Sequence, residues 1–160
     1  MSIGPRPPDV FVALDNDVLN DWRYQVPATL KAVAEYISVV KAPPAIPSPT
    51  IFEVMHGFDK AVVKAGGEDE RAREDRERVR KLISVCAVLP FNQDAAEIAA
   101  YIFPRLSKSE RAHHWTDVFI AATALAHDHG IATRNQADFE LIARHAPPHY
   151  PPIRLEIWKA

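Results

Sequence analysis

Residues 115–135 read WTDVFIAATALAHDHGIATRN and contain the strongest structural signals of the chain. An almost wholly apolar segment headed by Asp117 predicts a buried helix. The β-branched and small residues at 131–133 predict a short strand, which ends in a polar Thr-Arg-Asn cluster. A buried helix that leads directly into a buried strand is typical of α/β domains.

The rest of the chain continues this alternation. The run VFVAL at 10–14 lies between Pro7-Pro8-Asp9 and Asp15-Asn16-Asp17, as expected of a buried parallel strand. Further strands are predicted at 85–91 (VCAVLPF), 131–133 and 153–158. Helices are predicted at 27–40, from about residue 49, at 68–81 and at 94–106. Strands that alternate with helices predict a parallel sheet with helical layers.

Composition limits the class of protein. A chain of 160 residues that is 48% hydrophobic and 25% charged fits one globular domain over 1–160, with Pro-rich ends at 1–9 and 147–152 as terminal connections. A lone cysteine, Cys86, cannot form an internal disulfide, which indicates a reducing compartment. No signal peptide or membrane-spanning run is seen, so we expect a cytoplasmic protein without a membrane partner.

Charge argues against a strongly basic binder of nucleic acid. The net charge is −2, so a polyanion would have to be held at a local site. Residues 68–81 are nearly all charged, but acids and bases are equal in number there. This segment therefore predicts a solvated helix face and not an RNA-binding arm.

Acidic and amide side chains recur where ligands bind in parallel sheets. Asp15 and Asp17 follow the first strand, Asn135 follows another, and Glu53 and Asp117 fall in the opening turns of predicted helices. Taken singly, each could be a helix cap or a partner of a helix dipole; Glu53, for example, completes a Thr-x-x-Glu capping box. Taken together, carboxylates about 4 Å apart repel by about 4 kcal/mol at an effective dielectric near 20. A hard divalent cation would relieve that repulsion.

Five segments, in this order, resemble the PIN-domain family and, within it, the toxin ribonucleases of the VapC type. They are LDNDVL (14–19), SPTIFEVMHG (48–57), VCAVLPF (85–91), DVFIAATALA (117–126) and IATRNQADF (131–139). The resemblance implies a PIN-like three-layer fold, with a central, mainly parallel sheet of four or five strands flanked by helices. It covers most of the chain, and its last segment is the most specific.

The resemblance also implies the site residues. Asp15, Glu53 and Asp117 would be the catalytic, metal-binding acids, and the family's fourth acidic position maps to Asn135 or to Asp138. Thr133 and Arg134 match the family's Thr-Arg pair and would contact substrate or a carboxylate; a surface salt bridge is an equal alternative for Arg134. The family usually has Asp-Thr-Asn after the first strand, whereas this chain has Asp15-Asn16-Asp17. Asp17 is therefore a further candidate ligand, with helix capping as its alternative.

The implied function is that of an Mg²⁺- or Mn²⁺-dependent endoribonuclease, the toxin of a toxin–antitoxin pair. Oxygen ligands suit these ions, and a recessed crevice favours single-stranded or looped RNA. Lys108 and Arg111, with Arg134, are candidate bases for the substrate phosphate. A cognate antitoxin and a homodimer are the implied protein partners, and apolar residues in excess on helices 30–40 and 51–62 are compatible with a partner groove.

Two other functions start from the same residues. One is a catalytically idle PIN-like module that only binds a partner. The other is a haloacid-dehalogenase-type phosphatase, in which Asp15 of the Asp-x-Asp-x-Val sequence would be the nucleophile. Histidine sites are less favoured: Glu53-x-x-His56 has no second copy, and the pairs 113–114 and 127/129 have no cysteine partners and are interpreted as polar residues at helix ends.

Overall fold

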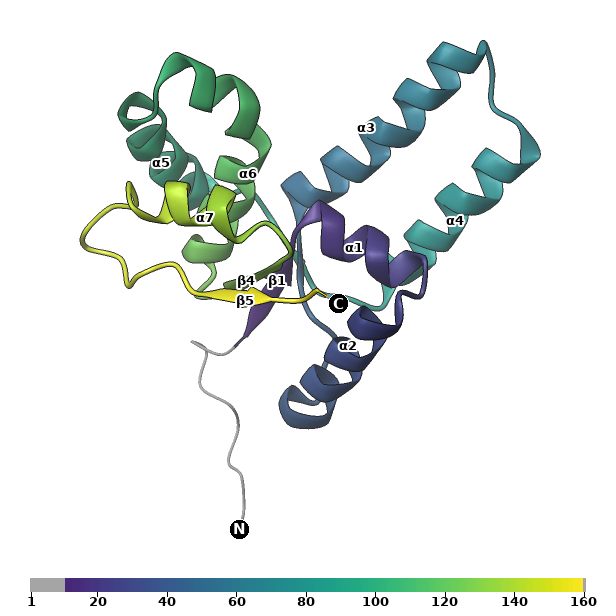
Figure 1. Ribbon diagram of the computed structural model, residues 1–160, viewed down its shortest axis with the longest axis horizontal. Helices are drawn as coiled ribbons and strands as arrows, with labels where there is room; N and C mark the ends of the chain where they lie inside the picture. The colour runs from purple at the N-terminus through teal and green to yellow at the C-terminus, as the bar shows by residue number, and fades with distance from the viewer. Residues whose placement is uncertain (1–10, 160) are drawn as a thin grey trace.

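The computed structural model describes residues 11–159, in which a parallel sheet lies between two groups of helices (Figure 1). The strands are β1 (Val12–Leu14), β2 (Ile46–Pro47), β3 (Val88–Leu89), β4 (Gly130–Thr133) and β5 (Leu155–Ile157). The helices are α1 (Asn16–Arg23), α2 (Pro27–Val40), α3 (Ser48–Ala65), α4 (Glu70–Ser84), α5 (Gln93–Ile102), the 3₁₀ turn η2 (Phe103–Arg105), α6 (Lys108–Ala126) and α7 (Gln136–Ala143).

All five strands run parallel. Strand β4 pairs with β1 on one side and with β5 on the other, and β2 pairs with β3. A parallel bridge between Ala13 and Ala45 brings the two groups together. This confirms the predicted parallel α/β fold. The predicted strand at 10–14 is β1, although Val10 and the Pro-rich segment 1–9 lie outside the described residues.

The two faces of the sheet bury different cores. Along β1, Val12 and Leu14 belong to one apolar cluster, whereas Ala13 between them belongs to the other. Strand β4 alternates in the same way, with Ile131 and Ala132 in opposite clusters. Because both faces are covered, β1 is apolar at every position and β4 has one polar residue, Thr133 at its end. Such apolar runs are the pattern that predicted both strands from the sequence.

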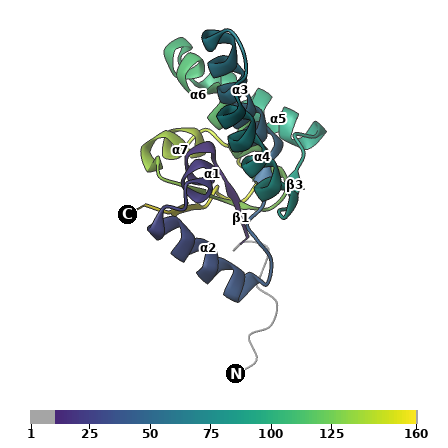
Figure 2. The same cartoon turned by 90° about the vertical axis from the view of Figure 1, so that its right-hand side faces the viewer.

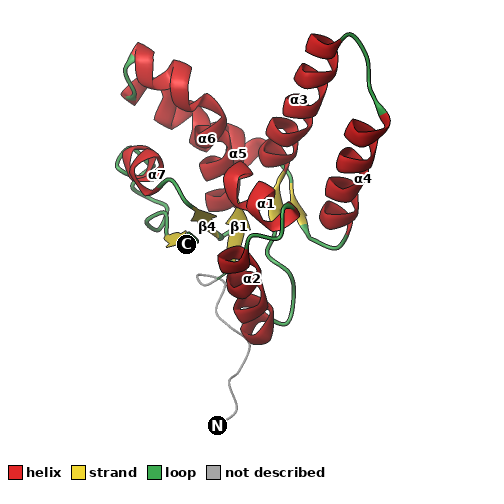
Figure 3. Cartoon of the chain, turned by 45° about the vertical axis from the view of Figure 1, so that its right-hand side comes forward, coloured by secondary structure: helices red, strands yellow, loops and turns green. Residues whose placement is uncertain are grey.

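Helices α5, α6 and α7 lie on one side of the sheet, and α1 to α4 lie on the other (Figures 1 and 2). Helices α3 and α4 form a long hairpin that projects away from the sheet (Figure 3). Helix α4 is mostly exposed, as its balanced charge predicts; Val79 is its one fully buried residue, and Arg76 pairs with Asp59 of α3 at 2.8 Å. In the described part of the chain, no helix is both long and apolar enough to cross a membrane.

Candidate metal centre

The site lies at the carboxyl edge of the sheet, where β1 and β4 end. Asp15 directly follows β1 and is 3% exposed. It is the N-cap of α1, where its Oδ1 accepts a hydrogen bond of 2.9 Å from the Val18 amide. Its other oxygen accepts from the hydroxyl of Thr133, the last residue of β4, at 2.5 Å. The buried carboxylate is therefore fixed by two neighbouring parallel strands and one helix start.

Asp17 does not cap α1, contrary to that alternative, because Asp15 occupies the cap and Asp17 lies in the first turn. Instead, Asp17 faces the residues that follow β4. The side-chain amide of Asn135 donates to Asp17 Oδ2. Arg134 lies 3.7 Å from Asp17 Oδ1 and 3.1 Å from Asp21 Oδ2. Asn135 heads α7 but makes no side-chain cap bond there, so its amide serves Asp17 instead.

Glu53 reaches the same edge from α3. The predicted capping box at Thr50 is wrong, because α3 begins earlier, at Ser48. The Thr50 hydroxyl instead donates to the carbonyl of Leu14 at 2.9 Å, which attaches the start of α3 to the end of β1. Glu53 lies one turn later, and its buried Oε2 has no hydrogen-bond partner among the described residues. Such an oxygen is costly to bury unless a proton or cation meets it.

Asp117 lies in the middle of α6 and not in its opening turn. The alternative that Asp117 interacts favourably with the helix dipole at the start of a helix is therefore wrong. Helix α6 begins at Lys108 with a capping box between Ser107 and Glu110. Asp117 lies one turn after His114, whose Nδ1 is 3.5 Å from Asp117 Oδ2.

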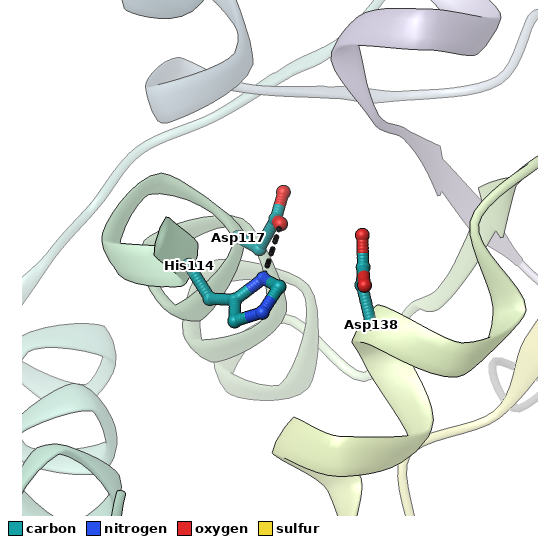
Figure 4. Close-up of side chains that lie close together, drawn as sticks. All are labelled: His114, Asp117 and Asp138. Atoms are coloured by element: carbon teal, nitrogen blue, oxygen red, sulfur yellow. Dashed lines mark hydrogen bonds and ion pairs between the residues drawn. The ribbon is translucent and has the colours of Figure 1, made fainter. Parts of the chain in front are cut away.

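Asp138 of α7 faces His114 and Asp117 across a short gap (Figure 4). One ligand atom from each of these three side chains lies within 4.8 Å of the other two. Of the two residues predicted for the fourth acidic position, Asp138 is the one that lies close to Asp117. The sequence analysis did not predict His114. Residues three apart on a helix lie on the same face, so the true start of α6 would have indicated that His114 lies beside Asp117.

Burial and mutual repulsion raise the pKa of three carboxyl groups in the site. Desolvation is the largest cause in each case. It raises the pKa of Asp15 to about 7 against the lowering effect of the Thr133 hydrogen bond. It raises the pKa of Glu53 to about 7, with further increases from Asp117, Asp15 and Asp17. For Asp117 the pKa rises to about 6, and the His114 hydrogen bond opposes the rise.

These raised pKa values connect acids from different elements. Glu53 of α3 responds to the charges of Asp117 on α6 and Asp15 after β1, so the three lie within electrostatic reach of one another. The donor set is almost entirely carboxylate oxygen, with one imidazole nitrogen at the edge. An unpaired buried oxygen and clustered acids that resist ionisation together fit a divalent cation that prefers oxygen ligands.

Two of the three basic residues that were predicted to contact the substrate phosphate do not lie at the acidic edge. Lys108 is the first residue of α6, about 14 Å along the helix axis from Asp117 at 1.5 Å per residue. Arg111 donates to the carbonyls of Phe103 and Leu106, so its guanidinium secures the turn before α6. Arg134 alone of the three lies at the acidic edge, and its ion pairs with Asp17 and Asp21 match the salt-bridge alternative.

The remaining histidines take ordinary helix and turn positions. His56 stacks on Phe52, one turn earlier in α3, with ring centroids 5.6 Å apart. His127 lies against the carbonyl of Pro90 at 2.9 Å. Within residues 11–159, His114, Asp117 and Asp138 are the one group with metal-ligand geometry. His114 therefore differs from the interpretation of these histidines as polar residues at helix ends.

Comparison with known families identifies the family of the chain. A model of the PIN domain matches residues 13–144, a span that includes every acid of the candidate site. The chain belongs to the PIN domain family. This match favours the PIN-domain interpretation of Asp15 over the phosphatase alternative. No curated protein matches the sequence.

Solved structures share the fold at low sequence identity. The crystal structure of VapBC2 from Rickettsia felis bound to a promoter DNA fragment contains a chain that is 15% identical, with a TM-score of 0.65, covering 94% of this chain and 100% of that one. A chain of DNA-bound VapBC from Salmonella typhimurium is 20% identical, with a TM-score of 0.64, covering 94% of this chain and 99% of that one. A chain of FitAB bound to an IR36 DNA fragment is 19% identical, with a TM-score of 0.65, covering 94% of this chain and 97% of that one. The chain therefore has the fold of these toxin–antitoxin structures.

Proposed function

We propose that this protein is an endoribonuclease that depends on Mg²⁺ or Mn²⁺ and acts as the toxin of a toxin–antitoxin pair. One observation carries the proposal: His114, Asp117 and Asp138 offer ligand atoms that lie within 4.8 Å of one another. Asp15 and Glu53 lie within electrostatic reach of Asp117, and burial raises the pKa of all three of these carboxyl groups. Membership of the PIN family gives this acidic cluster its chemical context. Without a cation, burial and mutual repulsion keep these acids partly protonated, whereas a bound cation would favour their ionised form.

Each residue has a role in the proposed hydrolysis. Asp15, Asp117 and Asp138 would hold the cation, with Glu53, Asp17 and Asn135 as further candidates. A bound Mg²⁺ or Mn²⁺ supplies a Lewis acid and acidifies water. Glu53, with a pKa of about 7, is suited to accept a proton from an attacking water near neutral pH.

The neutral and basic groups complete the site. Thr133 keeps the Asp15 carboxylate in place through the 2.5 Å hydrogen bond. The side chain of Arg134 is 44% exposed and that of Asp17 is 36% exposed. Because such an exposed ion pair is worth only about 0–1 kcal/mol, the guanidinium could leave Asp17 for a phosphate. No side-chain nucleophile is required.

The proposed substrate is single-stranded or looped RNA. The acids come from the end of β1, from α1 and from α3, α6 and α7, and their own side chains are buried or half-buried. A flexible strand can bring one phosphate to such a site, whereas a regular duplex presents its phosphates on a wide, stiff surface.

The proposed protein partners are an antitoxin and a second copy of the chain. The structural neighbours include VapBC and FitAB complexes, which supports an antitoxin. Apolar side chains remain exposed on α2 and α3: Leu30 at 40%, Ile37 at 37%, Phe52 at 50% and Val63 at 80%. Exposed apolar surface of this kind favours a protein partner. A monomer at micromolar concentration by light scattering, with no co-purifying small protein from the native host, would contradict both partners.

Cleavage of end-labelled RNA tests the proposed activity. We expect Mg²⁺ or Mn²⁺ to support cleavage of a single-stranded RNA, excess EDTA to abolish it, and the matching duplex to be cut far more slowly. Undiminished cleavage in EDTA would contradict metal dependence. No cleavage with either ion, together with no change in thermal stability when the ion is added, would favour the idle binding module.

A further inference from the structure

His114 lies beside two acids of the candidate metal centre, Asp117 on its own helix and Asp138 on α7 (Figure 4). The three side chains are those whose ligand atoms lie within 4.8 Å of one another. The family resemblance implied carboxylates and one amide for the centre, so an imidazole is a departure that belongs to this chain. A nitrogen donor in a centre of oxygen donors changes which cation the centre prefers.

Regular helices hold the three donors, and solvent reaches them. His114 and Asp117 are three residues apart on α6, which places them on one face a single turn apart. Helix α7, which contains Asp138, packs against α6. The side chains of His114 and Asp117 are 19% and 25% exposed, and Asp138 is half-buried. A cation can therefore approach the group from solvent.

The spacing of His114 and Asp117 suits two ligands of one ion. Nδ1 of His114 lies 3.5 Å from Oδ2 of Asp117, whereas a strong hydrogen bond between an imidazolium and a carboxylate is about 2.7–2.9 Å long. Two ligand atoms that each lie about 2.1 Å from an ion, at an angle of roughly 110°, are about 3.4 Å apart. The observed separation therefore matches a shared cation better than a strong direct hydrogen bond.

An imidazole also suits the charge of the group. Asp138 raises the pKa of Asp117, because two nearby carboxylates repel each other. A third carboxylate would add to this repulsion. A neutral imidazole instead adds a third donor and no negative charge.

We propose that His114 is a nitrogen ligand of the cation, beside Asp117 and Asp138, and that it makes the centre select Mn²⁺ over Mg²⁺. The inference rests on the proposed function, which allows either ion. Mg²⁺ is a hard cation that takes oxygen ligands and gives up its waters reluctantly. First-row transition-metal dications accept imidazole nitrogen as well as carboxylate oxygen. Replacing one oxygen donor by nitrogen therefore weakens Mg²⁺ binding relative to Mn²⁺ binding.

Calorimetric titration tests the selectivity. The dissociation constants of Mn²⁺ and Mg²⁺ are compared at pH 8 in wild type and in His114→Asn, which puts an amide oxygen near the position of Nδ1. We expect wild type to bind Mn²⁺ more tightly, and the ratio of the two constants to fall about tenfold in the variant. His113→Gln is the matched control, because His113 is the exposed neighbour whose ring contacts the Ser109 carbonyl. Its ratio should equal that of wild type, and circular dichroism checks that each variant folds.

Pulsed EPR of bound Mn²⁺ tests the ligand itself and needs only the wild-type protein. We expect a coupling between Mn²⁺ and a coordinated nitrogen, which changes from ¹⁴N to ¹⁵N when the protein is labelled with ¹⁵N-histidine. The coupling should be absent in His114→Asn and present in His113→Gln. A histidine that only orients Asp117 through a hydrogen bond would give no coordinated nitrogen and would leave the ratio of the two constants unchanged.

The results separate this inference from the proposed activity. Metal-dependent RNA cleavage by a wild type without the nitrogen coupling, or one that binds Mg²⁺ as tightly as Mn²⁺, would overturn the inference and leave the nuclease standing. The nitrogen coupling and the Mn²⁺ preference without RNA cleavage would support His114 as a ligand and contradict the nuclease. A wild type that binds neither ion would overturn both.

Discussion

The hydroxyl of Thr133 donates a 2.5 Å hydrogen bond to the carboxylate of Asp15, and so joins the ends of two neighbouring parallel strands across 118 positions of sequence. Both side chains are buried. The same Thr133 oxygen accepts a hydrogen bond of 2.9 Å from the backbone N–H of Asn135. This small network fixes the most buried acid of the candidate metal centre, and it makes the geometry of that site depend directly on the pairing of β1 with β4.

Replacing Thr133 by valine tests this network. Thr133→Val keeps the shape but leaves a buried Asp15 oxygen and the Asn135 amide unpaired. We expect the free energy of unfolding at pH 8 to fall by about 1–3 kcal/mol, as measured by urea denaturation. Thr133→Ser retains the hydroxyl and should lose much less. Equal losses in the two variants would mean that packing of the methyl group, and not the hydrogen bond, matters.

The raised pKa values predict how stability depends on pH in the absence of metal. Asp15, with an ordinary pKa of 3.8, titrates near 7 in the folded protein, and Glu53 moves from 4.5 to about 7. The folded state therefore binds more protons than the unfolded state between about pH 4 and pH 7. The stabilisation from these groups is fully present below their unfolded pKa and is lost as pH rises through about 7.

Thermal unfolding in EDTA measures this dependence. Because other groups also titrate, the comparison is between wild type and Asp15→Asn, which cannot ionise. The difference in stability between the two should change in favour of the variant as pH rises from 4 to 8, and added Mg²⁺ should remove that advantage. A difference that does not vary with pH would contradict the raised pKa values.

Asp117→Asn separates a metal ligand from a structural residue. Asp117 lies in mid-helix, so the substitution removes no cap, and it relieves the repulsion with Asp138. We expect RNA cleavage to fall by at least about a hundredfold, that is, by about 2.7 kcal/mol of transition-state stabilisation or more. Metal-free stability at pH 8 should be unchanged or increased. Activity within a fewfold of wild type would exclude Asp117 from the catalytic centre.

Asp17→Asn tests the residue that departs from the usual family sequence. Both carboxylate oxygens of Asp17 already have partners, Arg134 and Asn135, so we expect Asp17 to act as a charged neighbour and not as a ligand. Its charge raises the pKa of Asp15 and Glu53. The variant should be more stable without metal, and the acidic limb of its pH–rate profile should move to lower pH. A weakening of Mg²⁺ affinity by about tenfold or more, measured by calorimetry, would instead make Asp17 a ligand.

The sequence predicted the parts of the fold that leave a pattern. Strands β1 and β4 are buried on both faces, so their continuous apolar runs could be recognised. Strand β2 was not predicted, because it has two residues, Ile46 and Pro47, and a proline in a short run argues against a strand. Its partner β3 is likewise only two residues of the predicted 85–91 run.

The candidate site was predicted in its residues more than in its local structure. Asp15 and Asn135 follow from strand ends, which parallel topology brings together, whereas Thr133 came from the resemblance to the family. The position of Asp117 within its helix was wrong because the Ser107–Glu110 capping box, a readable signal, was overlooked. The contact with His114 was missed for the same reason.

We expect the acids at the carboxyl edge of the sheet to bind a divalent cation, and calorimetric titration with Mg²⁺ and Mn²⁺ measures this binding. With wild type at pH 8, binding should be saturable, lost in Asp117→Asn and retained in Arg80→Lys, which changes an exposed side chain of α4. Binding should weaken as pH falls through about 7 and then 6, because first Asp15 and Glu53 and then Asp117 take up protons. No detectable binding by the wild type, or binding of equal strength in Asp117→Asn, would exclude a cation site that depends on Asp117.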